Sequence, residues 1–459
     1  MSALTLRNAE LNGVRTDVRI EAGRIAAMGA LRGAHEIDAR GGALIPGLID
    51  HHIHLFATAA RMESVDLGAA RSKDDVISLL RAATAARAAD IWVRAIGFDD
   101  SVAGLLSRDE LDLVGAPNPI RVQDRTGALW VLNSVALERV LETPAPACVE
   151  LDASGRATGR IWRGDAWLRT RMGSAAPSLA ALSSQLAARG VVGVTDASVT
   201  NGAEEAQLLA AARGDGALRQ SLCLMGGGEL PASEQYEIGP LKILPDERDL
   251  PDVESVAAKM RLARQLGRAV AVHCVTAAEL AVTLAAYEAV GARKGDRIEH
   301  GGVIPEGMIE TVAALGLTVV TQPHFIFERG DRYRRTMDAQ EWSDLYRLAS
   351  LRRAGVAMAA GSDAPYGGLD PWRAIATAAA RTTREGEVLG AEERVSAHEA
   401  LALYLGGFHA PGGPARRVEV GAAPDLCLLD RPLTDALAAP SEVRVHATIA
   451  RGELIYEAS

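Results

Sequence analysis

The chain has 459 residues, of which 48% are hydrophobic and 24% are charged, as is typical of a globular protein. This length exceeds that of a minimal domain and accommodates a barrel of about 250 residues with further parts. A formal net charge of −10 and an aromatic content of 4% exclude a basic, aromatic surface for nucleic acid and a basic surface for an anionic membrane.

The two ends of the chain have the pattern of short strands. Residues 1–48 alternate apolar and polar positions around turns such as Asn12-Gly13, and residues 415–459 do the same around glycine turns. We expect both ends to form one composite, β-sandwich-like domain. The N-terminal residues carry charges throughout, so no signal peptide is expected. No apolar stretch of about 18 residues is present that would span a membrane.

Between these ends, residues 49–414 alternate apolar strands with alanine-rich amphipathic helices, which is the pattern of parallel βαβ units. We expect an α/β fold, a (β/α)8 TIM barrel whose chemistry lies at the carboxyl ends of its strands. Residues from about 65 to 185 fit this repeat less well. They are interpreted as an insertion after the first barrel strand that covers the mouth of the barrel.

The first predicted strand ends in two histidines on one face. His52 and His54 are two residues apart, so their side chains point to the same side of a strand, whereas His51 points to the other. Two imidazoles placed in this way bind a divalent ion, and imidazole suits zinc, iron or nickel. The alternative is a polar strand end whose histidines are satisfied by hydrogen bonds, and a lone His-x-His pair does not exclude it.

Three more residues favour the metal interpretation. His273, His300 and Asp363 each end an apolar run, in the order expected for barrel strands five, six and eight. Four of the ten histidines therefore occupy such strand ends. The histidines in less suggestive surroundings are interpreted as surface or packing residues: His35, His398, His409 and His446.

The cysteines indicate reduced thiols. Cys148, Cys223, Cys274 and Cys427 are far apart and form no Cys-x-x-Cys pair, which argues against a disulfide framework or a structural zinc site. A cytoplasmic protein is expected. Cys274 follows His273 on a predicted strand, so its side chain is expected to pack outward, away from the barrel interior.

The ordered motifs PGLIDHHIH, VAVH, IEH and GSDAP resemble the signature of the amidohydrolase superfamily. The segments IGFDD, ALWVLNS, GVVGVTDAS, GPLKIL and TQPHF resemble more closely its amidohydrolase 3 branch, the YtcJ-like metal-dependent hydrolases. The resemblance covers almost the whole chain. Each motif is weak alone, but the combination is specific.

The resemblance implies a lysine at the metal site. In many relatives the lysine that ends barrel strand four is carboxylated and bridges two metal ions, and Lys242 occupies that position. Two ions would then be held by five further residues, His52, His54 and Asp363 for the first and His273 and His300 for the second. The alternative is an ordinary lysine paired with Asp246 or Glu247, and then a single ion. Zinc is the expected cofactor, with one or two ions per chain.

The resemblance also implies how the site works. A bound divalent cation lowers the pKa of water to about 7. Asp363 is the expected catalytic residue, which takes the proton of water as a general base and passes it to the leaving nitrogen as a general acid. His324, just past a strand end in TQPHF, is expected either to contact the substrate or to be a hydrogen-bonded structural histidine.

The insertion supplies three further candidates for substrate binding. Trp130 in ALWVLNS matches a tryptophan of the YtcJ-like relatives, while Arg125 stands where they usually carry a histidine-serine pair. Arg125 would bind a substrate carboxylate through two hydrogen bonds, or it forms a surface ion pair. Asp99 corresponds to the aspartate of the family's Gly-Trp-Asp, but Phe98 replaces the tryptophan, so the pocket shape of relatives does not transfer directly.

The predicted function is hydrolysis of a non-peptide carbon–nitrogen bond in an amide, an N-acyl amine or a related small molecule. One alternative is a mononuclear deaminase or cyclic amidine hydrolase, whose relatives lack the strand-four lysine and carry a glutamate shortly after the strand-five histidine. Here the nearest candidate, Glu279, lies further along the chain. A second alternative is a non-catalytic scaffold, which the retained ligand positions disfavour. A small-molecule substrate, no nucleic acid and no membrane are the expected partners, and a homodimer is left open.

Overall fold

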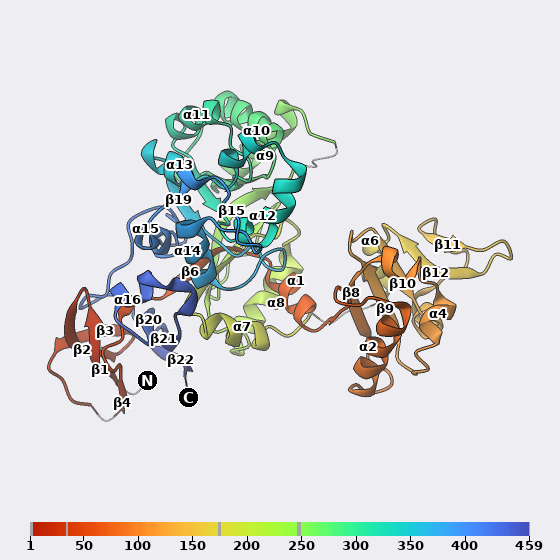
Figure 1. Ribbon diagram of the computed structural model, residues 1–459, viewed down its shortest axis with the longest axis horizontal. Coiled ribbons are helices and arrows are strands. Elements are labelled where there is room, and N and C mark those ends of the chain that lie inside the picture. Colours follow the sequence, from red (N-terminus) through yellow and green to blue (C-terminus); the bar gives the residue numbers. More distant parts are fainter. Residues whose placement is uncertain (1–2, 34, 173–175, 246–248, 459) are drawn as a thin grey trace. The chain divides into compact units, whose positions relative to one another are not determined.

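The computed structural model describes residues 3–33, 35–172, 176–245 and 249–458 (Figure 1). The chain divides into two compact units. The barrel unit comprises residues 1–58 and 179–459, and the insertion unit comprises residues 59–178. No helix of the described residues is long and apolar enough to cross a lipid bilayer.

The centre of the barrel unit is a parallel sheet of eight strands in chain order. Its strands are β6 (Leu48–Ile53), β13 (Val191–Asp196), β14 (Ser221–Gly226), β15 (Glu237–Ile243), β16 (Val270–Cys274), β17 (Arg297–His300), β18 (Thr318–Thr321) and β19 (Ala357–Ala360). Strands such as β6 and β13 are buried at every position, as expected for strands covered on both faces. The predicted (β/α)8 barrel is confirmed.

Helices follow most of these strands and cover the outside of the barrel (Figure 1). They are α1 (Leu55–Met62), α7 (Ala180–Ala187), α8 (Ala203–Gly214), α9 (Val253–Gln265), α10 (Ala277–Val290), α11 (Ile309–Ala314), α12 (Phe325–Thr336), α13 (Ala349–Arg353), α14 (Pro371–Ala380) and α15 (Ala397–Ala402). Leu241 and Ile243 of β15 pack in one apolar cluster with Val256 and Met260 of α9. Because side chains alternate along a strand, Lys242 between them faces the barrel interior.

The first and last barrel strands are joined by backbone hydrogen bonds. The amide of Asp363, just after β19, donates to the carbonyl oxygen of His52 at 2.7 Å. Three residues earlier on each strand, the amides of Ile49 and Ala360 donate instead to the carbonyl oxygens of residues 404 and 403. The loop after α15 therefore fills the seam between β6 and β19, and the carboxyl end of the seam is closed next to His52.

The two ends of the chain form two four-stranded sheets that share one apolar core. The first has the order β3-β2-β1-β4 and the second β22-β21-β20-β5. Their strands are β1 (Leu4–Leu11), β2 (Val14–Glu21), β3 (Arg24–Gly29), β4 (His35–Asp38), β5 (Leu44–Pro46), β20 (Leu426–Leu429), β21 (Val445–Ala450) and β22 (Glu453–Glu457), with α16 (Leu433–Ala438) after β20. Leu6 and Ile25 of the first sheet pack with Leu428 and Ile449 of the second, which confirms the expected sandwich-like arrangement.

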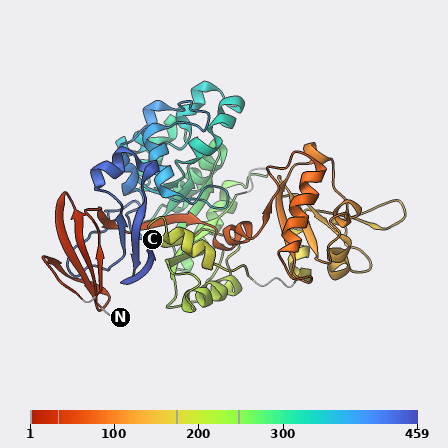
Figure 2. The same cartoon turned by 60° about the horizontal axis from the view of Figure 1, so that its bottom comes forward.

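The insertion unit is built on a six-stranded mixed sheet of order β11-β12-β10-β9-β8-β7. Its elements are β7 (Val65–Asp66), α2 (Lys73–Ala85), β8 (Val93–Phe98), α3 (Asp100–Ala103), α4 (Arg108–Asp112), β9 (Ile120–Asp124), β10 (Leu129–Leu132), α5 (Ser134–Val140), β11 (Val149–Leu151), β12 (Ala157–Trp162) and α6 (Asp165–Met172). Figure 2 shows α2 along one face of this sheet. Its buried Val76 and Leu80 pack with Val93 of β8 and Val122 of β9.

The insertion unit ends at residue 178, before α7. The sequence predicts this boundary at about 185, because residues up to there fit the βα repeat less well. In the structure, however, Ala187 of α7 packs against Val192 of β13, so the helix belongs to the barrel unit. Among the described residues, short 3-10 helices lie in the barrel unit at Glu306–Met308, Ala339–Asp344, Ala391–Glu393 and Pro440–Glu442.

The four cysteines are free. Cys274 is the last residue of β16, and its side chain packs on the outer face of the barrel, as its position after His273 predicts. Its thiol lies 3.3 Å from the hydroxyl oxygen of Thr283 on α10, and burial raises the pKa of this thiol to about 12. Cys274 is therefore a packing residue between strand and helix.

Candidate metal centre

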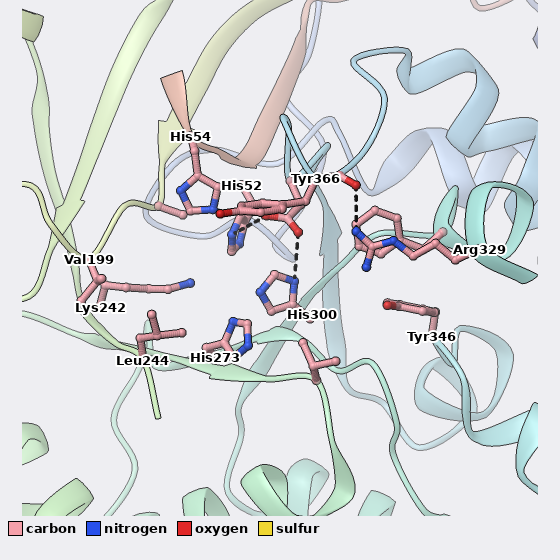
Figure 3. A pocket seen from close by; sticks show the side chains of 14 residues that line it. His52, His54, Val199, Lys242, Leu244, His273, His300, Arg329, Tyr346 and Tyr366 are labelled. Atoms are coloured by element: carbon pink, nitrogen blue, oxygen red, sulfur yellow. Dashed lines mark hydrogen bonds and ion pairs between the residues drawn. The ribbon is translucent and has the colours of Figure 1, made fainter. Parts of the chain in front are cut away.

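The carboxyl ends of the barrel strands surround a cavity of about 260 Å³ (Figure 3). The polar residues predicted from the strand ends line it together: His52, His54, Lys242, His273, His300 and Asp363. The remaining wall is mostly apolar, and it includes Val199, Leu244, Val275 and Phe325. Six side chains from five separate segments of the chain thus meet in one small space.

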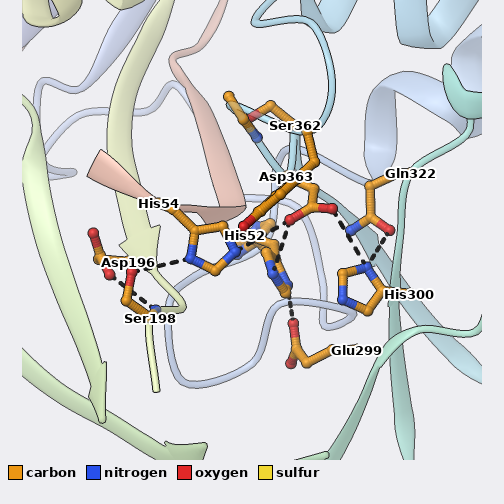
Figure 4. Close-up of polar contacts among 12 residues, drawn as sticks. His52, His54, Asp196, Ser198, Glu299, His300, Gln322, Ser362 and Asp363 are labelled. Atoms are coloured by element: carbon orange, nitrogen blue, oxygen red, sulfur yellow. Dashed lines mark hydrogen bonds and ion pairs between the residues drawn. The ribbon is translucent and has the colours of Figure 1, made fainter. Parts of the chain in front are cut away.

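Asp363 lies at the centre of this cluster (Figure 4). Its Oδ1 is 3.4 Å from Nε2 of His52 and 3.2 Å from Nε2 of His54, and its Oδ2 is 3.9 Å from Nδ1 of His300. The ring centroids of His273 and His300 are 4.5 Å apart. One ligand atom each from His52, His300 and Asp363 lie within 4.8 Å of one another, close enough to bind one ion.

The rings of three histidines are oriented by partners outside the cavity. Nδ1 of His52 donates a hydrogen bond to the carboxylate of Glu299. Nδ1 of His300 donates to the side-chain oxygen of Gln322 at 2.9 Å, and Nδ1 of His54 lies 3.0 Å from the hydroxyl of Ser198. Such partners fix the tautomer of a ligating imidazole and leave its other nitrogen free for a metal.

Glu299 and Arg297 form a buried ion pair below His52. Glu299 is fully buried and bonds to the guanidinium of Arg297, which also donates to the carbonyl oxygen of His51 at 2.9 Å. Burial alone would raise the pKa of Glu299, but Arg297 and then Lys242 lower it below the ordinary value for a glutamate. The group that orients His52 is therefore an anion.

Replacing Glu299 by glutamine should destabilise the barrel. The variant leaves the buried Arg297 without its counter-charge, and breaking such a pair typically costs about 3–5 kcal/mol. We expect a clear fall in the free energy of unfolding, measured by urea denaturation. The control is Glu254→Gln, which removes an exposed pair with Arg261 at 2.7 Å and should not move the midpoint. Equal midpoints for both variants would contradict the role assigned to Glu299.

Two residues of the site owe their direction to an unusual backbone. His300 has a φ of 71° and Asp363 a φ of 51°, both in the left-handed region that non-glycine residues rarely adopt. On a regular strand, His300 and the preceding Glu299 would point to opposite faces. The turn at His300 allows both to face the interior, where Glu299 bonds to His52 and His300 lines the cavity.

Lys242 is buried, with 3% of its surface exposed, and its Nζ has no hydrogen-bond partner. Burial lowers the pKa of this amine, although the nearby Glu299 and Asp363 raise it in part. The other expectation for Lys242, an ion pair with Asp246 or Glu247, concerns residues outside the described ones. Figure 3 shows the amine extending toward the histidines.

His324 does not line the cavity, as far as the described residues show. It is 2% exposed, and its Nε2 donates to the carbonyl oxygen of Ser362 at 3.0 Å. Burial lowers its pKa to about 4. Of the two sequence interpretations, this geometry favours the hydrogen-bonded structural histidine, which holds the residue before Asp363.

The other candidates for substrate binding lie in the insertion unit. Arg125 is exposed, and its Nε is 3.3 Å from the carboxylate of Asp99, which is the surface ion pair named as its alternative. Asp99 also caps α3 by accepting from the amide of Ser101. Trp130 is buried in the core of the unit, and its indole nitrogen donates to Asp165 at 2.8 Å.

Sequence reasoning missed the residues that hold the ligands in place. Glu299 stands in the quoted motif IEH, and a carboxylate inside a buried strand is a signal for a partner of opposite charge. Asp50, in the first motif, accepts from the amides of His52 and Ser362 and so joins β6 to the segment after β19. Gln322 and Ser198 carry no comparable signal.

The donor set fits a divalent cation. Burial lowers the pKa of His273 to about 4 and lowers those of His52 and His300 well below the ordinary value for an imidazole, so these rings are neutral and retain a free lone pair. Nε2 of His52 is buried without a hydrogen-bond partner. Neutral imidazoles with a carboxylate are the ligands that zinc and similar ions prefer.

A barrel with histidines and an aspartate at the carboxyl ends of its strands defines the class of metal-dependent barrel hydrolases. Within this class, the chain belongs to the amidohydrolase family, because the family model Amidohydro_3 matches residues 35–456. The family predicted from the motifs is thereby confirmed. The protein is a hydrolase of non-peptide carbon–nitrogen bonds, and its substrate is a small molecule.

Individual relatives agree with this assignment. An N-substituted formamide deformylase from Arthrobacter pascens is 28% identical, over 97% of this chain and 96% of its own length. The putative amidohydrolase YtcJ from Bacillus subtilis (strain 168) is 24% identical, over 81% of this chain and 80% of its own. The crystal structure of a metal-dependent hydrolase from Pyrococcus horikoshii OT3 has the same fold, with a TM-score of 0.77, 20% identity, and coverage of 96% and 99%.

Proposed function

We propose that this protein hydrolyses the amide bond of small N-acyl amines, including N-substituted formamides, with Asp363 as the catalytic residue. The observation that carries the proposal is the position of the Asp363 carboxylate, within 3.4 Å of two neighbouring imidazoles at the wall of a small, mostly apolar cavity. The similarity to the N-substituted formamide deformylase supports a small acyl group.

The metal ligands in this proposal are the six polar side chains of the cavity. His52, His54 and Asp363 would hold a first ion, His273 and His300 a second, and a carboxylated Lys242 would lie between the two. Zinc is the proposed ion. When bound, such a cation polarises the scissile carbonyl and lowers the pKa of water to about 7. Without carboxylation of Lys242 the site holds one ion.

Asp363 moves the proton in the reaction. Its carboxylate accepts a proton from the attacking water as the new carbon–oxygen bond forms, and donates that proton to the nitrogen as the carbon–nitrogen bond breaks. The products are a carboxylic acid, formic acid in the case of a formamide, and a free amine. The hydrogen bond from His52 to Glu299 keeps the His52 ring in place throughout.

The alternative of a mononuclear deaminase or cyclic amidine hydrolase requires a free carboxylate near His273. Glu279 is the candidate, and its Oε1 lies 4.0 Å from Nε2 of His273. However, Oε2 of Glu279 accepts hydrogen bonds from the amides of Val275 and Thr276 and completes the capping box of α10. A carboxylate used to cap a helix is poorly placed to move a proton, so we favour amide hydrolysis.

The first test is the metal content of the purified protein and of its His52→Ala variant, measured by elemental mass spectrometry. We expect close to two ions per wild-type chain and a reduced content in the variant, together with release of amine from N-substituted formamides. About one ion would favour the mononuclear alternative. No metal under metal-replete conditions, with no hydrolysis, would overturn the proposed function and favour the scaffold alternative.

A further inference from the structure

Arg329 is a cationic side chain of the cavity without an acidic partner. It belongs to α12 and lines the same cavity as the candidate ligands. Its guanidinium forms no ion pair with an acid among the described residues, whereas Arg334 and Arg335 of the same helix pair with Glu387 and Glu385 at 3.4 and 3.5 Å. An unpaired guanidinium in a small cavity is suited to bind an anion.

The guanidinium of Arg329 is held in one position. Its carbon atom Cζ lies 3.7 Å from the ring centre of Phe325, one helical turn earlier, and its Nη2 donates to the carbonyl oxygen of Tyr366 at 2.7 Å. These contacts use one face of the group and one of its donors. The neighbouring Glu328 interacts with Arg329 through its charge but forms no ion-pair contact with it, and its carboxylate accepts from the amide of Gly368 at 3.0 Å.

The charges of the cavity also favour an anionic substrate. Among the described lining residues, Asp363 and Lys242 belong to the proposed metal centre, where a carboxylated Lys242 is itself an anion, so Arg329 is the cation that remains for a substrate. Figure 3 shows Lys242 and Arg329 on opposite sides of the cavity, with His300 between them. A substrate whose amide lies at the histidines can place its far end beside Arg329, where Phe325 and Tyr346 offer apolar surface for a hydrocarbon side chain, while Val199 and Leu244 line the side of Lys242.

We propose that Arg329 binds a carboxylate on the amine portion of the substrate, so that the substrates are N-formyl or other short N-acyl derivatives of apolar amino acids. This inference rests on the proposed function, and it names the substrate class of that site. It assigns to Arg329 the role that the sequence had suggested for Arg125. Arg329 acts as a specificity residue and takes no part in the proton transfer.

The test compares racemic N-formylleucine with N-formylleucinamide, which lacks the negative charge. We expect wild-type protein to prefer the acid, and Arg329→Met to lower kcat/KM for the acid roughly 10- to 100-fold, mainly through KM, since a lost charged hydrogen bond has this magnitude. Hydrolysis of the amide should fall much less, because a neutral carboxamide accepts a weaker hydrogen bond from the guanidinium than a carboxylate does. Arg329→Lys should recover part of the preference, because it keeps the charge but not the planar fork. Arg335→Met, on an exposed position of the same helix, is the matched control.

Binding distinguishes failure of this inference from failure of the proposed function. Both compounds are titrated calorimetrically into Asp363→Asn and into Asp363→Asn with Arg329→Met. If wild-type protein hydrolyses neither compound but the acid binds in an Arg329-dependent manner, the carboxylate site stands and the proposed reaction is wrong. The inference is overturned if N-formylleucine binds Asp363→Asn no more tightly than N-formylleucinamide does, or if it binds equally well when Arg329 is also replaced. This conclusion holds whether or not the wild-type protein hydrolyses either compound.

Discussion

Replacing Asp363 by asparagine is expected to reduce kcat for an N-substituted formamide by at least roughly 10²- to 10⁴-fold, which is the usual contribution of a positioned general acid–base group. Asparagine has nearly the same shape as aspartate but cannot accept the proton of water. Its side-chain oxygen remains a possible metal ligand beside His52 and His54. We therefore expect turnover to be lost while much of the metal is retained.

The measurement is kcat together with the metal content of the same preparation. Asp370→Asn is the matched control, since Asp370 lies seven residues further along and caps α14 by accepting from the amide of Trp372 at 3.0 Å. Asparagine is an equally good cap, so this variant should keep normal activity. Near-normal turnover by Asp363→Asn would show that another group moves the proton. If Asp363→Asn loses all of its metal, its loss of turnover would be explained by the loss of a metal ligand and not by the loss of the proton-transferring group.

The barrel and the main members of the site were predictable because two simple rules apply to them. Parallel strands alternate with helices, so apolar runs separated by amphipathic segments predict the barrel. Polar residues at the carboxyl ends of such strands meet at one rim. His273, Lys242 and His52 follow both rules, and the structure places all three in the cavity lining.

The orientation of the ligands was not predictable, because it depends on departures from regular strands. Glu299 and His300 are adjacent, and strand alternation would put only one of them inside. The left-handed backbone at His300 brings both inside, and nothing in the motif IEH indicates it. The motif GSDAP likewise does not indicate the left-handed backbone of Asp363, which lies just beyond the end of β19 and has a φ of 51°.

Arg329 shows a second limit of sequence reasoning. The segment FIFERGDRYRRT contains four arginines, and a helical pattern alone does not tell which of them faces a cavity. Arg125 stood out instead because its neighbours resemble a family motif. Its position is exposed and paired with Asp99, whereas Arg329 is unpaired and lines the cavity. Recognition of a charged substrate depends on which arginine lacks a partner, and that is a property of the folded chain.

The second large effect is expected at Lys242. Its amine is buried, has no hydrogen-bond partner and shares the cavity with four histidines, so carbon dioxide can convert it to a carbamate that offsets the charge of two cations. Lys242→Met keeps the length and apolar part of the side chain but cannot form a carbamate. We expect the metal content to fall from about two ions to one or none, and hydrolysis to be lost.

A direct observation of the carbamate makes this prediction specific to the modification. Protein prepared with ¹³C-labelled bicarbonate should show a carbamate signal in its ¹³C spectrum, and Lys242→Met should lack it. Lys259→Arg, which changes an exposed lysine of α9, should retain both the signal and the metal. If wild-type protein holds two ions without a carbamate signal, Lys242 does not bridge them. If Lys242→Met keeps two ions and full activity, the five other ligands suffice to hold both ions. Asp363 would then supply the only negative charge among these five ligands, since the histidines are neutral.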